Sequence, residues 1–445
     1  MKKNILTILS FLVTCLIYAQ SDKYVVLISI DGFRPDFYLE EEWPAPNLKE
    51  MAEQGTKALG VRGVFPSVTY PSHTTLITGD KPYNHGIYYN APFEPEVQTG
   101  KWYWEADLIK SQTLWQAVRD ANLTSASFFW PVSVGAPIDY NIPEVWSLDK
   151  NSKFMAENRK NENPKGFLAE LEKAATGVLT EHNFNGDYLN REDRTGEMAA
   201  YTLETYKPNF MSIHLIATDH FQHSEGKKGA TVYKALAATD RAIGKIREAA
   251  QRANIDDKLT IIVTGDHGFV DIHSSISPNI WLKDLGLLDD SKNSGNWKAI
   301  FHTSGASAFL ILKNPDDTKT LNMVKDKLNS LPKNIQKLFR VVSKEELQTE
   351  GSSKEAVLAL APIPGVAMSG STKGDIIQPR KGGTHGYFPN FKAIETGFVA
   401  WGAGIQKSKT IETMNIEDIA PIVAEILEVN FTPKDGVLYP GILKD

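Results

Sequence analysis

An uninterrupted apolar segment near the start of the chain constrains the fold more than any other feature. Residues 23–30 read KYVVLISI, are rich in β-branched side chains, and end at Asp31-Gly32. A strand that is apolar on both faces must be covered on both faces, which is typical of parallel sheets flanked by helices. A second such run, residues 258–264, is followed by Gly265-Asp266. We therefore predict an α/β fold built on a mostly parallel sheet.

Strand and helix patterns alternate along most of the chain. Further strands are predicted over 125–129 and 209–216, and helices over 47–54, 71–78, 112–121, 164–180, 192–206, 229–253 and 416–427. This alternation predicts helices on both faces of the sheet, with sites at the carboxyl ends of the strands. Pro71 suits the first turn of its helix, so Thr69 is expected just before the helix N-terminus. Asp31, Asp219 and Asp266 all follow strand-like runs and should meet at one edge.

The stretch 285–381 breaks this pattern. It contains a short strand at 306–312, a helix near 318–331 and a Pro-rich loop. We interpret it as an inserted α+β cap in a chain of 445 residues, which is long enough for one large α/β domain or two smaller ones. The predicted organisation is a signal peptide at 1–20, a catalytic core at 21–284, the cap at 285–381, and the C-terminal part of the core at 382–445.

The first twenty residues have the composition of a secretory signal. Lys2 and Lys3 precede an apolar stretch at 5–17, and Tyr18-Ala19-Gln20 resembles a cleavage site. We expect a secreted or periplasmic protein without a membrane span; an uncleaved anchor or a lipid anchor on Cys15 are the alternatives. Cys15 is the only cysteine. The mature chain would therefore lack disulfides, thiol catalysis and cysteine-bound zinc.

The charge of the chain argues against binding of duplex nucleic acid. The formal net charge is −6, and removal of residues 1–20 would bring it near −8. Without a basic run, the chain has no face suited to the phosphate backbone. The sequence does not indicate an oligomeric state.

Three short motifs supply metal-ligand side chains. Asp219 and His223 are four residues apart, so a helix would place them on one face. Asp266-His267 lies between Gly265 and Gly268, which permit a turn, and His385 is surrounded by glycines. Each motif alone also has an ordinary interpretation as a helix cap, a polar turn or a loop histidine. Together with Asp31, they supply the kinds of side chain that bind a pair of divalent metal ions.

Thr69 is a candidate nucleophile. It lies in the segment FPSVTYPSH at 65–73. A threonine hydroxyl attacks poorly unless a base or a metal lowers its pKa. The helix that follows would aim backbone N–H groups at an anion. The alternative is that Thr69 simply caps that helix.

Together these segments resemble the nucleotide pyrophosphatase/phosphodiesterase family of the alkaline phosphatase superfamily. The similar segments occur in the family's order between residues 24 and 430, at 29–34, 65–79, 85–90, 219–223, 266–268 and 384–386. The resemblance implies an alkaline-phosphatase-like fold and two Zn²⁺ ions per chain. Asp219, His223 and His385 would bind one zinc. Asp31, Asp266 and His267 would bind the other, with Thr69 bridging to it.

The resemblance also implies a mechanism. Asn90 and the backbone N–H of Thr69 would hold a phosphoryl oxygen, and two metals about 4 Å apart would stabilise the attacking and leaving oxygens. Ser72 stands where the family often has asparagine, beside the chemistry. Sulfatases need a cysteine-derived nucleophile, which the mature chain lacks. The Thr69-Tyr70-Pro71 segment does not match the nucleophile site of alkaline phosphatase monoesterases.

We therefore predict a two-zinc phosphodiesterase or nucleotide pyrophosphatase that acts through a phosphothreonine. The expected substrate is a small phosphate ester, preferably a nucleotide, because Tyr70 could stack on a base. Tyr140, in the aromatic segment from Phe128 to Trp146, could form a second aromatic wall of the substrate-binding site. The alternatives are a lysophospholipid phosphodiesterase, a phosphomonoesterase and a non-catalytic binding module.

Overall fold

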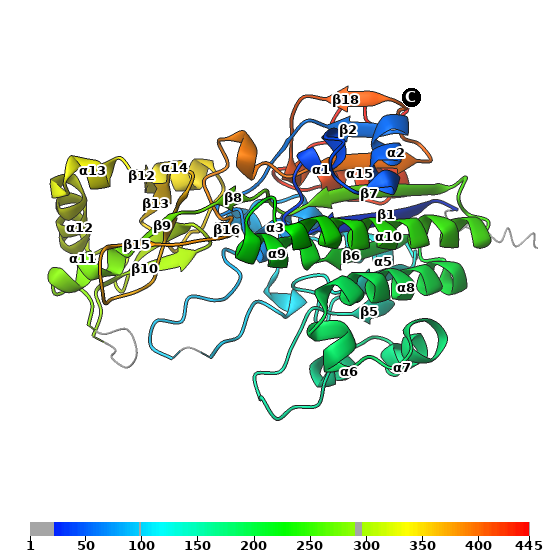
Figure 1. Ribbon diagram of the computed structural model, residues 1–445, viewed down its shortest axis with the longest axis horizontal. Coiled ribbons are helices and arrows are strands. Elements are labelled where there is room, and N and C mark those ends of the chain that lie inside the picture. Colours follow the sequence, from blue (N-terminus) through cyan, green and yellow to red (C-terminus); the bar gives the residue numbers. More distant parts are fainter. Residues whose placement is uncertain (1–21, 98, 290–295, 445) are drawn as a thin grey trace, which may run out of the picture.

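The computed structural model describes residues 22–97, 99–289 and 296–444. The predicted signal sequence, including Cys15, lies outside these residues. The largest element is an eight-stranded sheet with the order β18-β2-β17-β7-β1-β6-β4-β5 (Figure 1). Its bounds are β1 Tyr24–Ile30, β2 Thr56–Ala58, β4 Ser125–Phe128, β5 Tyr140–Ile142, β6 Phe210–Leu215, β7 Leu259–Gly265, β17 Phe398–Gly402 and β18 Lys409–Ile411.

The five strands β7, β1, β6, β4 and β5 run parallel. The central strand β1 shows why its sequence is apolar throughout. Val26, Ile28 and Ile30 lie in one apolar core, whereas Val25 and Leu27 lie in another on the opposite face. Helices α2 (Pro46–Gln54), α8 (Tyr188–Tyr206) and α10 (Ala230–Arg252) contribute to the first core, and α3 (Thr69–Thr78), α5 (Leu114–Asp120) and α15 (Ile419–Leu427) contribute to the second. The predicted fold class is confirmed.

Several helix bounds differ from the predictions. Helix α3 begins at Thr69 and not at Pro71. Pro71 still lies in the first turn, where a missing backbone N–H costs no helical hydrogen bond, so the helix can start before it. Helix α8 begins at Tyr188 because the Asp187 side chain accepts a hydrogen bond from the Asn190 N–H. The helix predicted over 164–180 is shorter: α7 spans Phe167–Leu171 and continues as a π-helix over Glu172–Thr176.

A second, antiparallel unit lies beyond one end of the large sheet (Figure 1, yellow). Its four-stranded sheet has the order β10-β11-β13-β12. Its apolar core includes Ile276 and Trp281, which precede residue 285. The bounds are α11 Pro278–Asp284, β10 Ala299–Ser304, β11 Ser307–Leu312, α12 Thr318–Ser330, α13 Lys333–Gln336, β12 Phe339–Ser343, α14 Lys344–Thr349 and β13 Leu358–Pro362.

Short elements connect the two units. Strand β16 (Gly383–Thr384) pairs with β8 (Val270–Asp271) and returns the chain to the edge of the large sheet. The remaining α-helices and β-strands are α1 Asp36–Leu39, β3 Val61–Arg62, α4 Pro82–His85, α6 Ala156–Asn161, α9 Ala217–Glu225, β9 Ser274–Ile276, β14 Val366–Met368, β15 Ile377–Pro379 and β19 Met414–Asn415. Within the part of the chain described, no helix combines the length and the apolar character that a membrane span needs.

Candidate active site

Three adjacent parallel strands end at the predicted acidic residues. Asp31 directly follows β1, Asp266 directly follows β7, and Asp219 lies in the first turn of α9, which starts two residues after β6. Because β1 pairs with both β6 and β7, the carboxyl ends of the three strands meet at one edge of the sheet. The structure thus brings together three aspartates that lie far apart in the sequence.

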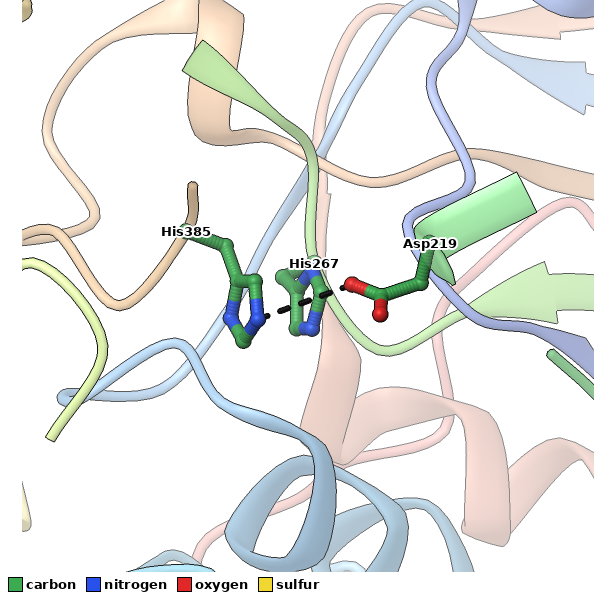
Figure 2. Close-up of side chains that lie close together, drawn as sticks. All are labelled: Asp219, His267 and His385. Carbon is green, nitrogen blue, oxygen red and sulfur yellow. Dashed lines mark ion pairs between the residues drawn. The ribbon is translucent and has the colours of Figure 1, made fainter. Parts of the chain in front are cut away.

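The ligand atoms form two adjoining groups. One comprises Asp31, Asp266 and His267, the other Asp219, His267 and His385, and the atoms within each group lie within 4.8 Å of one another. His267 Nε2 is 3.1 Å from Asp266 Oδ2 and 3.4 Å from Asp31 Oδ1. Figure 2 shows His385, whose Nε2 is 3.6 Å from Asp219 Oδ1 and whose ring stacks on His267 with centroids 3.5 Å apart.

His223 completes the predicted set. Its Nε2 is 3.3 Å from Asp219 Oδ1, one helical turn away on α9. All six predicted ligands therefore lie in one place. His267 belongs to both groups, whereas the predicted division assigned it only to the group of Asp31.

Several of these ligand atoms are buried without a partner. Asp31 Oδ1, Asp219 Oδ1, Asp266 Oδ2 and His267 Nε2 have no hydrogen-bond partner among the described residues. A buried polar atom without a partner is costly, so native proteins rarely leave several together. Carboxylate oxygens and imidazole nitrogens are ligands that zinc accepts. The residues present therefore fit a divalent metal.

Backbone carbonyls orient the three histidines. Nδ1 of His267 donates to the Gly268 carbonyl at 3.1 Å, Nδ1 of His223 to Gly383 at 3.0 Å, and Nδ1 of His385 to Ser67 at 3.0 Å. A carbonyl only accepts, so each Nδ1 carries a proton, and in the neutral ring the lone pair is then on Nε2. This arrangement is typical of histidines that bind a metal through Nε2.

The electrostatics of the cluster favour a bound cation. Burial raises the pKa of Asp31 well above its ordinary value, and the nearby Asp219 and Asp266 carboxylates raise it further. Burial lowers the pKa of His385 to about 3, with a further contribution from His267. His385 is therefore neutral near pH 7 and can act as a ligand. Burial opposes the ionisation of Asp219 and Asp266, but the neighbouring histidines lower the pKa of both, so these carboxylates carry negative charge that a cation can neutralise.

Thr69 lies on a segment that is anchored to both groups. It is the first residue of α3 and is 8 % exposed. Two residues earlier, Ser67 accepts the hydrogen bond from His385. One turn later, Nδ1 of His73 donates to the Thr69 carbonyl at 2.8 Å and lies 3.8 Å from Asp266 Oδ2.

Asn90 is fixed beside the same helix start. Its Oδ1 accepts a hydrogen bond from the Tyr70 N–H at 2.9 Å. A backbone N–H only donates, so the amide oxygen must face Tyr70 and the Nδ2 group must point elsewhere. Asn90 can thus offer N–H donors to an anion next to Thr69.

Residues 25–388 match the model of a family described as type I phosphodiesterase/nucleotide pyrophosphatase. The chain belongs to this family. The resemblance of the sequence segments is therefore confirmed.

Members of this phosphodiesterase family align with most of the chain. Mouse ectonucleotide pyrophosphatase/phosphodiesterase family member 3 is 25 % identical over 93 % of this chain, which spans 43 % of that protein. Rat family member 7 is 24 % identical over 96 % of this chain and 87 % of its own length. A bis(5'-adenosyl)-triphosphatase of Xenopus laevis is 25 % identical, with coverages of 93 % and 80 %. The chain thus spans less than half of the length of some relatives.

Solved structures of the phosphodiesterase family share the fold. Human ectonucleotide pyrophosphatase/phosphodiesterase 5 superposes with a TM-score of 0.67 at 20 % identity, covering 93 % of this chain and 97 % of that chain. The murine counterpart, an inactive threonine-to-alanine variant in complex with AMP, gives a TM-score of 0.66 at 20 % identity with the same coverages.

In this phosphodiesterase family member, Asp31 is also held by His214 and Glu144, which no sequence motif indicated. Nε2 of His214, on β6, donates to Asp31 Oδ2 at 3.1 Å, and its Nδ1 donates to Glu144 Oε2 at 2.8 Å. Burial alone would lower the pKa of His214, but the hydrogen bonds with Asp31 and Glu144, together with the charges of these carboxylates, outweigh burial and raise it to about 10. The one sequence feature that indicates a role for His214 is its position as a histidine within the apolar strand β6.

The rings of two predicted substrate-binding residues pack against other side chains and do not face a substrate site. The Tyr70 ring is 0 % exposed and meets Trp102 edge-on with centroids 5.1 Å apart, so its face is not open to a base. Tyr140 stacks on Tyr206 with centroids 4.1 Å apart. It pairs with Ala126, which lies level with Val26 near the start of β1, so the structure does not bring Tyr140 to the acidic edge.

Glu192 supports the helix that carries Asp219 and His223. Its buried side chain accepts hydrogen bonds from the N–H groups of Ile216, at 2.7 Å, and Ala217. Burial raises the pKa of Glu192 from 4.5 to about 7. The folded state therefore holds the proton more tightly, and this stabilisation is complete below pH 4.5 and lost as pH rises through about 7.

We expect Glu192→Gln to remove this pH dependence, because the amide oxygen still accepts but does not titrate. Between pH 5 and 8, the free energy of unfolding of the wild type should fall relative to the variant by up to about 3 kcal/mol. Urea denaturation at both pH values measures this difference. Glu204→Gln, on the exposed side of α8, is the control, and an equal trend in both variants would contradict the assignment.

Proposed function

We propose that this chain is a two-zinc phosphodiesterase or nucleotide pyrophosphatase with Thr69 as its nucleophile. The observation that carries the proposal is the set of buried ligand atoms without partners, contributed by Asp31, Asp219, Asp266 and His267, at the edge where α3 begins. Membership of the phosphodiesterase family supports the reaction class.

Asp219, His223 and His385 would hold one zinc, and Asp31, Asp266 and His267 the other, with the Thr69 hydroxyl beside the second. When bound, zinc supplies Lewis-acid stabilisation of negative charge and lowers the pKa of a bound hydroxyl. The carbonyls that accept from the three histidine Nδ1 atoms keep each Nε2 aimed at its ion.

Thr69 Oγ1 would attack phosphorus in line with the ester bond that breaks. Thr69 gives its hydroxyl proton to water as its oxygen–phosphorus bond forms, the leaving oxygen departs and takes a proton from water, and a phosphothreonine remains that carries the retained ester group. Water then attacks the same phosphorus, and Thr69 leaves and regains its proton. Asn90 Nδ2 and the backbone N–H of Thr69 would donate to a phosphoryl oxygen throughout, since the Tyr70 N–H is already bonded to Asn90 Oδ1. The inactive threonine-to-alanine variant of the murine structural relative supports this role.

We propose a nucleotide-type diester or pyrophosphate as substrate. Trp102 meets Tyr70, and Trp146 meets Trp102 with centroids 5.2 Å apart, so aromatic rings in contact lead from the residue after Thr69 to Trp146. Trp146 is 37 % exposed and offers the base a surface that Tyr70 does not. A cavity of about 330 Å³ is lined by Phe93, Trp102 and His302 among others, and we propose that it accommodates a second ester group. AMP in the murine relative supports the nucleotide choice.

A substrate panel tests the proposal. We expect bis-p-nitrophenyl phosphate to be cleaved faster than p-nitrophenyl phosphate, and ATP or dinucleoside phosphates faster than lysophosphatidylcholine. Loss of stacking in Trp146→Ala should weaken nucleotide use by about 5- to 150-fold, since base–aromatic stacking contributes about 1–3 kcal/mol. Leu148→Ala is the control, because Leu148 is also exposed but has no π-face. Lysophosphatidylcholine as the best substrate, with Trp146→Ala unchanged on nucleotides, would reject the nucleotide assignment.

We also propose that the chain is exported and cleaved near residue 20. The relatives include ectonucleotide and venom enzymes, which supports an extracytoplasmic location. The intact mass of exported protein tests cleavage, and retention of residues 1–20 would contradict it.

A further inference from the structure

A continuous chain of hydrogen bonds connects Asp31 to the helix turn that carries Thr69. Asp31 Oδ2 accepts from His214 Nε2 at 3.1 Å, and His214 Nδ1 donates to Glu144 Oε2 at 2.8 Å. The other oxygen of Glu144, Oε1, accepts from the Tyr70 hydroxyl at 3.0 Å. Tyr70 follows Thr69 directly, so the chain closes a loop between the proposed nucleophile and a proposed ligand of its metal.

The members of this chain have little freedom to move. His214 is 3 % exposed and lies on the parallel strand next to β1, and the Glu144 side chain is 13 % exposed. Nδ1 of His214 is also 3.2 Å from the Phe129 carbonyl oxygen. Both ring nitrogens of His214 face carboxylates, and hydrogen bonds to charged groups are shorter and stronger than neutral ones.

We propose that His214 and Glu144 are positioning residues that hold the Asp31 carboxylate at a fixed distance from the first turn of α3. This inference rests on the proposed function. The Asp31 oxygen that does not face His214, Oδ1, is one of the buried atoms without a partner, so His214 determines how the carboxylate presents Oδ1 to an ion. Glu144 and Tyr70 then transmit the same constraint to Thr69.

A purely structural role would have different consequences. Replacing a buried ion pair with apolar groups of similar volume is often neutral or even stabilising, so stability alone gives little reason for a charged bridge at this position. If the bridge served only the fold, variants would change the unfolding midpoint and leave metal affinity unchanged. A positioning role instead predicts that one of two zinc sites weakens while the other, formed by Asp219, His223 and His385, does not.

Two isosteric substitutions separate the two ends of the bridge. The Gln amide nitrogen occupies roughly the place of His Nε2, whereas the Asn amide nitrogen occupies that of Nδ1. His214→Gln keeps a donor for Asp31, and His214→Asn keeps a donor for Glu144. Titration of Zn²⁺ against a chromophoric chelator should show that one of two zinc equivalents binds 10- to 100-fold more weakly in His214→Asn. In His214→Asn, the affinity for the other zinc equivalent should stay within about threefold of the wild-type value. In His214→Gln, the affinities for both equivalents should do so.

The control is His85→Asn. His85 is fully buried and hydrogen-bonds Thr75 and the Ile87 N–H, with no contact to the six ligands. This variant removes a buried imidazole but should leave both zinc equivalents unchanged. An equal loss of affinity in His85→Asn and His214→Asn would show a general effect of destabilisation and would overturn the inference.

Tyr70→Phe tests the outer end of the bridge with minimal risk to the fold, since it removes only one hydroxyl. We expect both zinc equivalents to bind as in the wild type, kcat to fall by about tenfold and KM to change little. Unchanged kcat in Tyr70→Phe together with unchanged zinc affinity in His214→Asn would overturn this inference and leave the proposed function standing. A wild-type chain that bound no zinc would overturn the proposed function as well, and thus the two failures are distinguishable.

Discussion

Thr69→Ala is expected to reduce turnover of bis-p-nitrophenyl phosphate by at least about 10³-fold, because the attacking oxygen is lost and residues that act as one unit cannot compensate. Zinc content should remain near that of the wild type, since all six predicted ligands are intact. Steady-state kinetics and elemental analysis of the same preparation measure both quantities. Full diesterase activity in this variant would refute the nucleophile assignment.

Thr69→Ser is the matched control. It retains a hydroxyl at the start of α3 and loses only a methyl group, so measurable turnover should persist. Wild-type enzyme quenched in acid during turnover should carry the retained ester group on Thr69, and peptide mass spectrometry locates it. Neither variant should shift the unfolding midpoint strongly, because Thr69 is not part of an apolar core cluster.

Removal of metal is expected to abolish activity and to lower thermal stability. Asp31, Asp219 and Asp266 would then lie close together in a buried site without a compensating cation. Binding stabilises the folded state by about 2.7 kcal/mol when the free metal is at 100 times its Kd. We expect dialysis against a chelator to lower the unfolding midpoint and to reduce activity by at least about 10³-fold. Added Zn²⁺ should restore both. Fewer than one zinc per chain after metal-replete preparation would favour a non-catalytic binding module.

His267→Ala sharpens this test because His267 belongs to both ligand groups. Its loss should abolish binding of the zinc beside Thr69, which it is proposed to ligate, and weaken the other zinc less, because its ring also stacks on His385. His220→Ala is the control: His220 lies next to Asp219 on α9 but stacks on Tyr188 with centroids 3.7 Å apart. Equal zinc loss in both variants would contradict the assignment of His267 as a zinc ligand.

Local patterns predicted the part of the site that depends on strand ends. Apolar runs that stop at Asp31 and Asp266 place these residues at one edge of a parallel sheet, whatever the details of the loops. His214 was not predictable in the same way. Its role depends on register, since it pairs with Ser29 on β1 and so lies within reach of Asp31. Glu144 comes from a loop after β5, where sequence alone gives no partner.

The errors have a common physical origin. Tyr70 and Tyr140 were assigned from aromatic character alone, which does not distinguish a ring that faces a ligand from one that packs in the interior. Tyr70 is buried by Trp102, and Tyr140 lies at the wrong end of a short edge strand. Helix starts were displaced where a cap such as Asp187 decided the boundary.

The strand order has a consequence for biogenesis. Strand β17 lies between β7 and β2, and it follows His385 in the sequence. During synthesis, β7 therefore keeps an unpaired edge until β17 has emerged, and the cluster of proposed ligands lacks its last histidine until His385 has emerged. An open edge of a hydrophobic strand invites pairing with other chains. Nascent and truncated forms of this protein should therefore depend on chaperones, and a bound metal can protect only the finished chain.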